Sequence, residues 1–480
     1  MAQIQVIRDP EIVQSDIIHY LESEKVEGTD TFINNQTDVN QTDVYGVLMP
    51  ILALNNVAVG YRELIRFELD MLGRTPAVYF KFKDIRGVFS AYVDAGNDNE
   101  LRVQILPPVE NTYKKINFTF FVTDISINNG IVEGKAIYKL AKFTQTNFEA
   151  LGKKTTYEIC DHISLQTGLG FASNVEVTND SRYMECRYKS YKDLLGSEIE
   201  KSVSDMYQVY DWWVDQNNYL TLCNIYDRVT SEDSDEEMKI WSTTNYDDPT
   251  TGNKKDTHLV PCILTNHPDF ATTDLAVTDF EIISNPVTHG NARIVSVFYE
   301  GKKDWTDNYI GDGDIKRDEF MEFEYGGEVY GDYDYLFAEQ SRNLFLNKLK
   351  SETIVIKMKT PMLGLNRGSQ VKFVWYNNSS SKQYLQNKVE TTDVGALTTE
   401  DIFVRYPKLA WLADFIISGK NADTFPMVLD MQYSGQYTVL GQYIIYENTS
   451  WYCELHCVRP KSLKPEIFPV FDNETGEPIN

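Results

Sequence analysis

The chain has 480 residues, of which 42% are hydrophobic, so it can build about two to four domains with sizeable cores. Its 71 acidic residues outnumber its 45 basic residues, which gives a formal net charge of -26 at pH 7. Sequence-independent binding to duplex nucleic acid depends on basic side chains that neutralise phosphates, so this balance argues against that class of function.

The sequence also argues against membrane insertion and a disulfide scaffold. It contains no run of about 18 apolar residues, and its first residues, MAQIQVIRDPEIVQ, do not show the basic start and apolar stretch of a secretory signal. Six cysteines in a chain of this length are too sparse for a disulfide framework. We therefore expect synthesis in a reducing cytoplasm and no stable membrane insertion.

Residues 1–44 are polar and contain a near-repeat, Asn35–Val39 followed by Asn40–Val44. A segment with so few apolar residues cannot form a core of its own. We predict an N-terminal arm that becomes ordered only against a neighbouring molecule.

Residues 45–150 show the period-two alternation of half-buried strands, in Arg66–Met71, Val78–Lys83 and Phe118–Thr123. Asn128, Asn129 and Gly130 form a strong hairpin signal. The pattern predicts a first antiparallel barrel or sandwich of about 100 residues.

Residues 151–230 mix helix and strand signals. Thr155 and Thr156 are candidate helix caps, and Gly168 marks the expected end of that helix. The next segment, Phe171–Asn174, should be extended. Leu194, Leu195, Ile199 and Val203 then recur at helical spacing, and Tyr210 to Asn224 reads as a hairpin that turns at Asp215–Asn218.

Residues 231–372 return to β-rich sequence. The acidic run Ser231–Glu237 predicts a solvated loop, and a cation site there is the alternative interpretation. Strands are expected at Val277–Ile283, Arg293–Tyr299 and Thr353–Lys359, with a helix over Tyr335–Lys350.

Residues 373–424 are predicted to be an insertion that offers a lateral contact surface. The strand that follows Met362–Phe373 should find its returning partner in Ser434–Val439, after which an apolar strand ends at Arg459. Residues 425–480 would then complete the second barrel and form a C-terminal tail.

Three motifs, Gly168–Phe171, Trp212–Asp215 and Met362–Phe373, carry a resemblance to the baseplate hub proteins of contractile-tailed bacteriophages, including the late-control D proteins and the VgrG spikes. The resemblance extends over roughly residues 45–459. It implies an α+β, mainly β fold with two hub-type antiparallel β-barrels, a small α/β module between them and an insertion in the second barrel. The alternative interpretation is that Trp212 and Trp213 are core aromatics of an unrelated mixed α/β domain.

The same resemblance implies a structural role rather than an enzymatic one. Proteins of this family form a homotrimeric hub that adapts a sixfold tail tube to a threefold central spike around a lumen for DNA. The expected partners are the tail tube protein, the central spike protein, the baseplate wedge proteins and the tape measure protein. The expected location is the tail baseplate of the virion, after assembly in the host cytoplasm.

Candidate metal sites fail on spacing. Cys453 and Cys457 would share one face of a strand while His456 points to the other, and no second ligand pair completes a zinc site. Asp312 and Asp314 resemble the start of a calcium loop, but the glycine and the last carboxylate are out of register. We predict buried strand cysteines and a solvated turn.

No catalytic, cofactor-binding or metal-binding residue is predicted, and no cofactor is expected. None of the six histidines stands in a nucleophile motif, and His162 is expected to be a surface or capping residue. The sequence contains no glycine-rich phosphate loop or dinucleotide fingerprint.

Two other functions are left open by the sequence. One is a different structural part of a tail or injection machine. The other is a virion-borne carbohydrate-binding or cell-wall-degrading protein, suggested by the aromatic cluster between Trp305 and Tyr335, which could stack on sugars.

Overall fold

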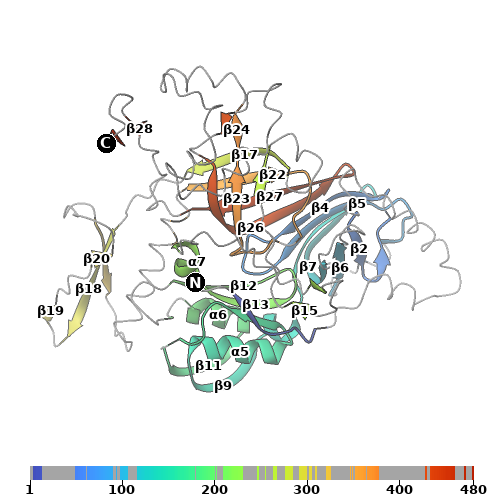
Figure 1. Ribbon diagram of the computed structural model, residues 1–480. Coiled ribbons are helices and arrows are strands. Elements are labelled where there is room, and N and C mark those ends of the chain that lie inside the picture. Colours follow the sequence, from blue (N-terminus) through green and yellow to red (C-terminus); the bar gives the residue numbers. More distant parts are fainter. Residues whose placement is uncertain are drawn as a thin grey trace.

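The computed structural model is mainly β, with one large curled sheet and a small α/β module beside it (Figure 1). It describes residues 4–12, 49–60, 62–89, 98–105, 116–178, 180–199, 209–230, 263–266, 276–284, 352–363, 365–377 and 433–459, together with short strands and single positions elsewhere. The mainly β fold class predicted from the sequence is confirmed.

The large sheet has 13 strands, drawn from two blocks of the chain. The first block supplies β2 (Ile51–Leu54), β3 (Val57–Ala58), β4 (Leu64–Asp70), β5 (Ala77–Lys83), β6 (Glu100–Ile105), β7 (Ile116–Asn128) and β8 (Ile131–Tyr138). The second block supplies β16 (Ile263–Thr265), β17 (Val277–Ser284), β22 (Glu352–Met358), β23 (Gln370–Val374), β26 (Gly435–Glu447) and β27 (Ser450–Val458). The two blocks meet where β26 pairs with β4 in antiparallel fashion.

The alternation found in the sequence sets which side chains face the core. In β5, Val78, Phe80 and Phe82 are buried while the residues between them are partly exposed. One hydrophobic cluster runs through both blocks and into the module, and it includes Phe67 and Leu455. The parts of the chain therefore share one continuous core.

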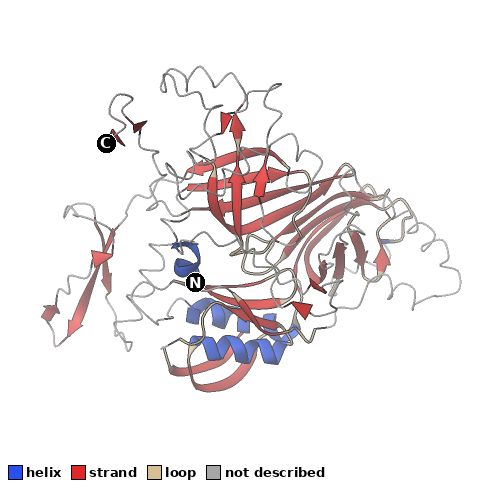
Figure 2. Ribbon diagram, in the orientation of Figure 1, coloured by secondary structure: helices blue, strands red, loops and turns tan. Residues whose placement is uncertain are grey.

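The module is layered, with helices lying between its two sheets (Figure 2). One sheet has the order β1-β10-β13-β12, and the other is a ribbon of two strands, β9 and β11. The elements are β1 (Gln5–Arg8), α4 (Ala141–Thr144), β9 (Asn147–Lys154), α5 (Thr156–Thr167), β10 (Gly170–Ser173), β11 (Arg182–Lys189), α6 (Tyr191–Ile199), β12 (Tyr210–Val214), β13 (Tyr219–Asn224) and α7 (Ile225–Thr230).

Helix α5 begins and ends where its sequence predicts. Thr155 is the N-cap and forms a capping box with Glu158, while Gly168 closes the helix with φ 75. The buried face includes Ile159 and Ile163. The predicted extended segment and the hairpin after it are also present, as β10 and as β12 with β13; Val203 lies outside the described residues.

The N-terminal residues differ from the predicted arm. Strand β1 pairs with β10, Ile4 is fully buried, and Arg8 forms an ion pair with Asp161 at 2.8 Å. The segment lies so close that a Cβ on Gly170 would come within 2.9 Å of Pro10. Residues 4–12 are thus part of the fold, because β10 offers a free edge that a polar-looking strand with one apolar anchor can complete.

The predicted start of the module also shifts. Strand β9 begins at Asn147 and pairs with β11, so the module includes residues that the sequence had assigned to the first barrel, up to residue 150. Residues 13–48 and the acidic run 231–237 lie outside the described residues, as do most of the predicted helix 335–350 and of the insertion 373–424.

The remaining strands lie outside the large sheet and the module. They are β14 (Tyr246–Asp247), β15 (Lys254–Lys255), β18 (Asn291–Tyr299), β19 (Lys302–Asp304), β20 (Tyr309–Ile310), β21 (Phe320–Tyr325), β24 (Tyr376–Asn377), β25 (Val428–Leu429), β28 (Val470–Phe471) and β29 (Pro478–Ile479).

Candidate functional site

The two blocks of the large sheet repeat the same order of strands. In the first block the order is β4-β5-β8-β7-β6, and in the second it is β17-β22-β27-β26-β23. The order along the chain also corresponds, since β7 and β26 are each followed directly by their hairpin partners, β8 and β27. The blocks differ at the next strand, because β2 pairs antiparallel with β6 whereas β16 pairs parallel with β23.

The two hairpins have the same construction. Strands β7 and β26 are each 13 residues long, and each turns through two residues with positive φ: Asn129 and Gly130 in the first block, Asn448 and Thr449 in the second. Two such residues are the mark of the turn that matches the twist of antiparallel strands. The repeat therefore extends from strand order to turn geometry.

The joint between the blocks is an antiparallel pairing, held on one face by polar side chains. Tyr443 of β26 donates a hydrogen bond to Glu68 of β4, and Arg66 forms ion pairs with both Glu68 and Glu447, the latter at 3.0 Å. Burial and the hydrogen bond to Glu68 raise the pKa of the Tyr443 phenol, so it remains a donor at neutral pH.

The backbones approach closely at the end of the joint. A Cβ on Gly441 would lie 2.5 Å from the carbonyl oxygen of Met71, and the Met71 amide donates to the carbonyl of Gln442 at 2.9 Å. A glycine is needed here because any side chain would push the two blocks apart.

One face of the sheet runs across both blocks, through the joint, and is polar. Opposite residues in neighbouring strands lie on the same side, so the pairing registers define the members of this face. Its acidic members are Glu68, Asp70, Glu100, Asp124, Glu133, Asp279, Glu281, Glu447 and Glu454, and its basic members are Arg66, Lys81, Lys83, Arg102, Lys135 and Lys357. The face is therefore net acidic.

A second joint connects the module to the sheet through Asp211 of β12. Its buried carboxylate accepts from Arg74 at 3.2 Å and from Arg367 at 2.8 Å. Each arginine also stacks on a tryptophan of β12. Arg74 lies over Trp212 and Arg367 lies over Trp213, and each guanidinium is 5.4 Å from the ring centre. One carboxylate thus holds a loop from each block.

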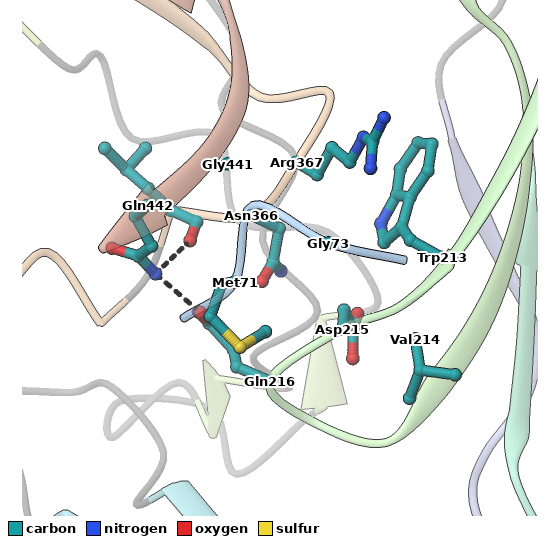
Figure 3. Close-up of a pocket in the computed structure, with 11 residues that line it drawn as sticks. Met71, Gly73, Trp213, Val214, Asp215, Gln216, Asn366, Arg367, Gly441 and Gln442 are labelled. Carbon is teal, nitrogen blue, oxygen red and sulfur yellow. Dashed lines mark hydrogen bonds between the residues drawn. The ribbon is translucent and has the colours of Figure 1, made fainter. Parts of the chain in front are cut away.

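Buried amides extend this joint. The Gln442 amide donates to Gln216 in the β12–β13 turn at 2.8 Å and to the carbonyl of Leu365 at 2.9 Å (Figure 3). Gln216 in turn donates to the carbonyl of Leu363. The space beside them is about 10 Å³, room for about one water molecule. The hollow is too small for an organic ligand and belongs to the packing of the joint.

The residues considered for zinc are strand residues, as predicted. Cys453 and Cys457 are fully buried in β27, and burial raises the pKa of the Cys453 thiol to about 12. His456 lies between them on the polar face, and burial lowers its pKa. Such thiols are inert as nucleophiles and ligands at neutral pH.

His162 does not stand alone. Its Nε2 lies 3.0 Å from a carboxylate oxygen of Glu149, so it links α5 to the ribbon strand β9. Among the described residues, no group of three or more His, Cys, Asp or Glu side chains could hold a metal ion. Asp312 and Asp314 lie outside the described residues, as do most of residues 305–335.

Sequence reasoning missed the residues that make the joints. Glu68 and Arg66 were recognised only as members of an alternating strand, and neither Gln442 nor Asp211 was singled out. The available signal was local: a charged residue beside Trp212 and a glutamine in an apolar strand are both expensive to bury without partners.

The part of the chain that the structure describes contains no helix long and apolar enough to cross a membrane.

No protein-family model and no curated protein matches the sequence. Solved structures do resemble it, with low identity. The 43 kDa tail protein of prophage MuSo2 from Shewanella oneidensis is 11% identical with a TM-score of 0.48, covering 86% of this chain and 98% of that one. A tail protein from Neisseria meningitidis MC58 is 8% identical with a TM-score of 0.47, covering 87% and 98%.

A VgrG-containing structure resembles the chain as well. The half-lidded Francisella PdpA-VgrG complex is 8% identical with a TM-score of 0.42, covering 94% of this chain and 64% of that one. These similar structures are thus a prophage tail protein, a second tail protein and a VgrG complex. Because all three scores are below 0.5, we base the functional proposal on the geometry of this chain.

Proposed function

We propose that this chain is a structural protein of a bacteriophage tail or a related injection machine, and that it acts as a baseplate hub. The observation that carries the proposal is the repeated strand order of two blocks joined edge to edge in one sheet. With two equivalent blocks in each chain, three chains present six near-equivalent blocks around one axis. Such a homotrimeric ring adapts a sixfold tail tube to a threefold spike.

The proposed ring has the tail tube protein on one side and the central spike protein on the other. The wedge proteins lie outside it, and the tape measure protein reaches its lumen. The first barrel, the module, the second barrel and its insertion at 373–424 remain the proposed division of the chain. The proposed location is the virion baseplate, reached after assembly in the host cytoplasm.

The polar face of the sheet suits the wall of such a lumen. Its excess of carboxylates, among them Asp70, Asp279 and Glu454, repels the phosphates of passing DNA and so prevents adhesion. Among the described residues, the thiols are buried and carboxylates such as Glu133 are hydrogen-bonded to other side chains. A catalytic group would instead need contact with a substrate in an open cleft. We accordingly assign the chain a structural role without catalysis.

Native mass measurement together with electron microscopy of the purified chain tests this proposal. We expect a species of three times 55.3 kDa that appears as a ring of six lobes around an opening. A monodisperse monomer at all concentrations, including those above about 10 µM, would contradict it, since stable interfaces assemble well below that range.

A charge-reversal pair tests the lumen. Asp70→Lys with Glu454→Lys should make the ring retain DNA in a salt-dependent manner, because phosphates bind added lysines. Glu176→Lys with Glu185→Lys, at exposed positions on the module, is the matched control with the same change in net charge. Equal retention of DNA by both variants would contradict the proposal that the polar face lines the lumen.

A further inference from the structure

Two edges of the large sheet lie within the repeated strand order, and each is paired on one side only among the described residues. The second half of β7, residues 123–128, pairs with β8 on one side only, and β17 pairs only with β22. Unpaired edges expose backbone donors and acceptors that can pair with another chain. Strands β3 and β16 are also paired on one side only, but they lie outside the repeated order, so we consider the edges of β7 and β17.

The internal repeat relates these edges to the joint inside the chain. By strand order, β7 corresponds to β26 and β17 corresponds to β4. The pairing registers agree residue by residue. In the second block, the residues opposite one another in successive strands are Tyr443, Glu454, Lys357 and Asp279. In the first block they are Asp124, Lys135, Tyr79 and Glu68. Asp124 therefore corresponds to Tyr443, and Asp279 to Glu68.

Residues on the two edges are more exposed than their counterparts in the joint, as expected for strands that have a partner on one side only. Ile127 is 40% exposed whereas its counterpart Tyr446 is 7% exposed. Ser126 is exposed whereas its counterpart Ile445 is buried by the pairing of β26 with β4. On the other edge, Asp279 is exposed whereas Glu68 is buried.

We propose that β7 of one copy pairs antiparallel with β17 of the next copy, repeating between chains the β26–β4 joint found within each chain. This inference rests on the proposed ring, in which three such contacts alternate with three internal joints and close the sheet. The internal joint sets Ile445 opposite Glu68 and Ile444 opposite Leu69. The copied register sets Ser126 opposite Asp279 of the next copy and Ile125 opposite Phe280.

The contact has one electrostatic peculiarity. In the copied register Asp124 faces Glu281 of the next copy, and like charges directly opposite each other destabilise a strand pair. Lys135 and Lys357 lie in the adjacent strands, and Lys357 is 3.2 Å from Glu281 within its own chain. These lysines offset only part of the repulsion between Asp124 and Glu281. Salt screens the remainder, so the fraction of trimer should increase between about 20 mM and 300 mM salt. Asp124→Asn should remove most of that dependence.

Engineered disulfides test the strand pairing and its register. The variants Ser126→Cys/Asp279→Cys and Ile125→Cys/Phe280→Cys place cysteines directly opposite, at the Cα separations of about 4.5–5.5 Å that a disulfide spans. The matched control Ser126→Cys/Glu281→Cys is diagonal, at about 7–8 Å, beyond that range. After oxidation, at least one opposite pair should give covalent dimers and trimers several-fold more abundant than the control gives.

The five described native cysteines are buried and should contribute little background, which the single variants Ser126→Cys and Asp279→Cys measure. Melting of the reduced Ser126→Cys/Asp279→Cys variant should match that of the wild type, because both positions are exposed. The reduced Ile125→Cys/Phe280→Cys variant should melt lower, because both side chains pack against the core. A trimer that yields no cross-link at either opposite pair, or equal cross-linking in the diagonal control, overturns the proposed contact and leaves the ring standing. A chain that is monomeric and yields no cross-link overturns both proposals.

Discussion

Gln442 donates a hydrogen bond to Gln216 at 2.8 Å, although 226 positions separate them in the chain. One residue belongs to the second block of the sheet and the other to the module, and both are buried. The pair therefore reports directly on whether the module is docked.

Replacing Gln442 by Leu should lower the free energy of unfolding by about 2–4 kcal/mol, because the oxygens of Gln216 and Leu365 would lose their donor while remaining buried. Denaturant titration measures the loss. Gln436→Leu, at an exposed position of the same strand, is the control and should change stability by less than about 0.5 kcal/mol. Similar effects of the two substitutions would speak against a buried amide network.

Replacing Asp211 by Asn should cost about 3–5 kcal/mol, since Arg74 and Arg367 would lose the carboxylate that they share. The control Glu185→Gln breaks an exposed pair with Arg187 and should have almost no effect. Urea unfolding of both variants tests the contrast; a tolerant Asp211 would mean that aromatic packing alone holds the joint.

Replacing Ile4 by Ala should destabilise the chain by about 2–4 kcal/mol, because the side chain is fully buried beside β10. Ile7→Ala, at a side chain that is 45% exposed in the same strand, should be nearly neutral. Deleting residues 1–12 should lower the melting temperature. An unchanged melting curve would restore the interpretation of residues 1–44 as an arm that matters only in assembly.

Alkaline pH should weaken the joint between the blocks. The pKa of Tyr443 is raised in the folded chain above its ordinary value of 10.0, so its contribution is complete below about pH 10 and is lost as pH rises further. Unfolding free energy measured from pH 8 to 11 should therefore fall above pH 10. Tyr443→Phe should make that fall shallower, whereas Tyr183→Phe, at an exposed tyrosine, should leave it unchanged.

Local sequence determined the elements themselves. The capping residues Thr155 and Glu158 and the stop at Gly168 act within one helix, and the turn at Asn129 and Gly130 acts within one hairpin, so no distant contact was needed to predict them. The alternation in β5 and β27 likewise specified which side chains are buried, including Cys453 and Cys457.

Tertiary structure alone decided which edges meet. A period-two pattern states that a strand has a buried face, but it does not identify the strand beside it, so the pairing of β26 with β4 could not be read from the sequence. For the same reason the docking of residues 4–12 and the pairing of Asp211 with two arginines from separate blocks were missed. These contacts join residues far apart in the chain, and only the folded backbone brings them within reach.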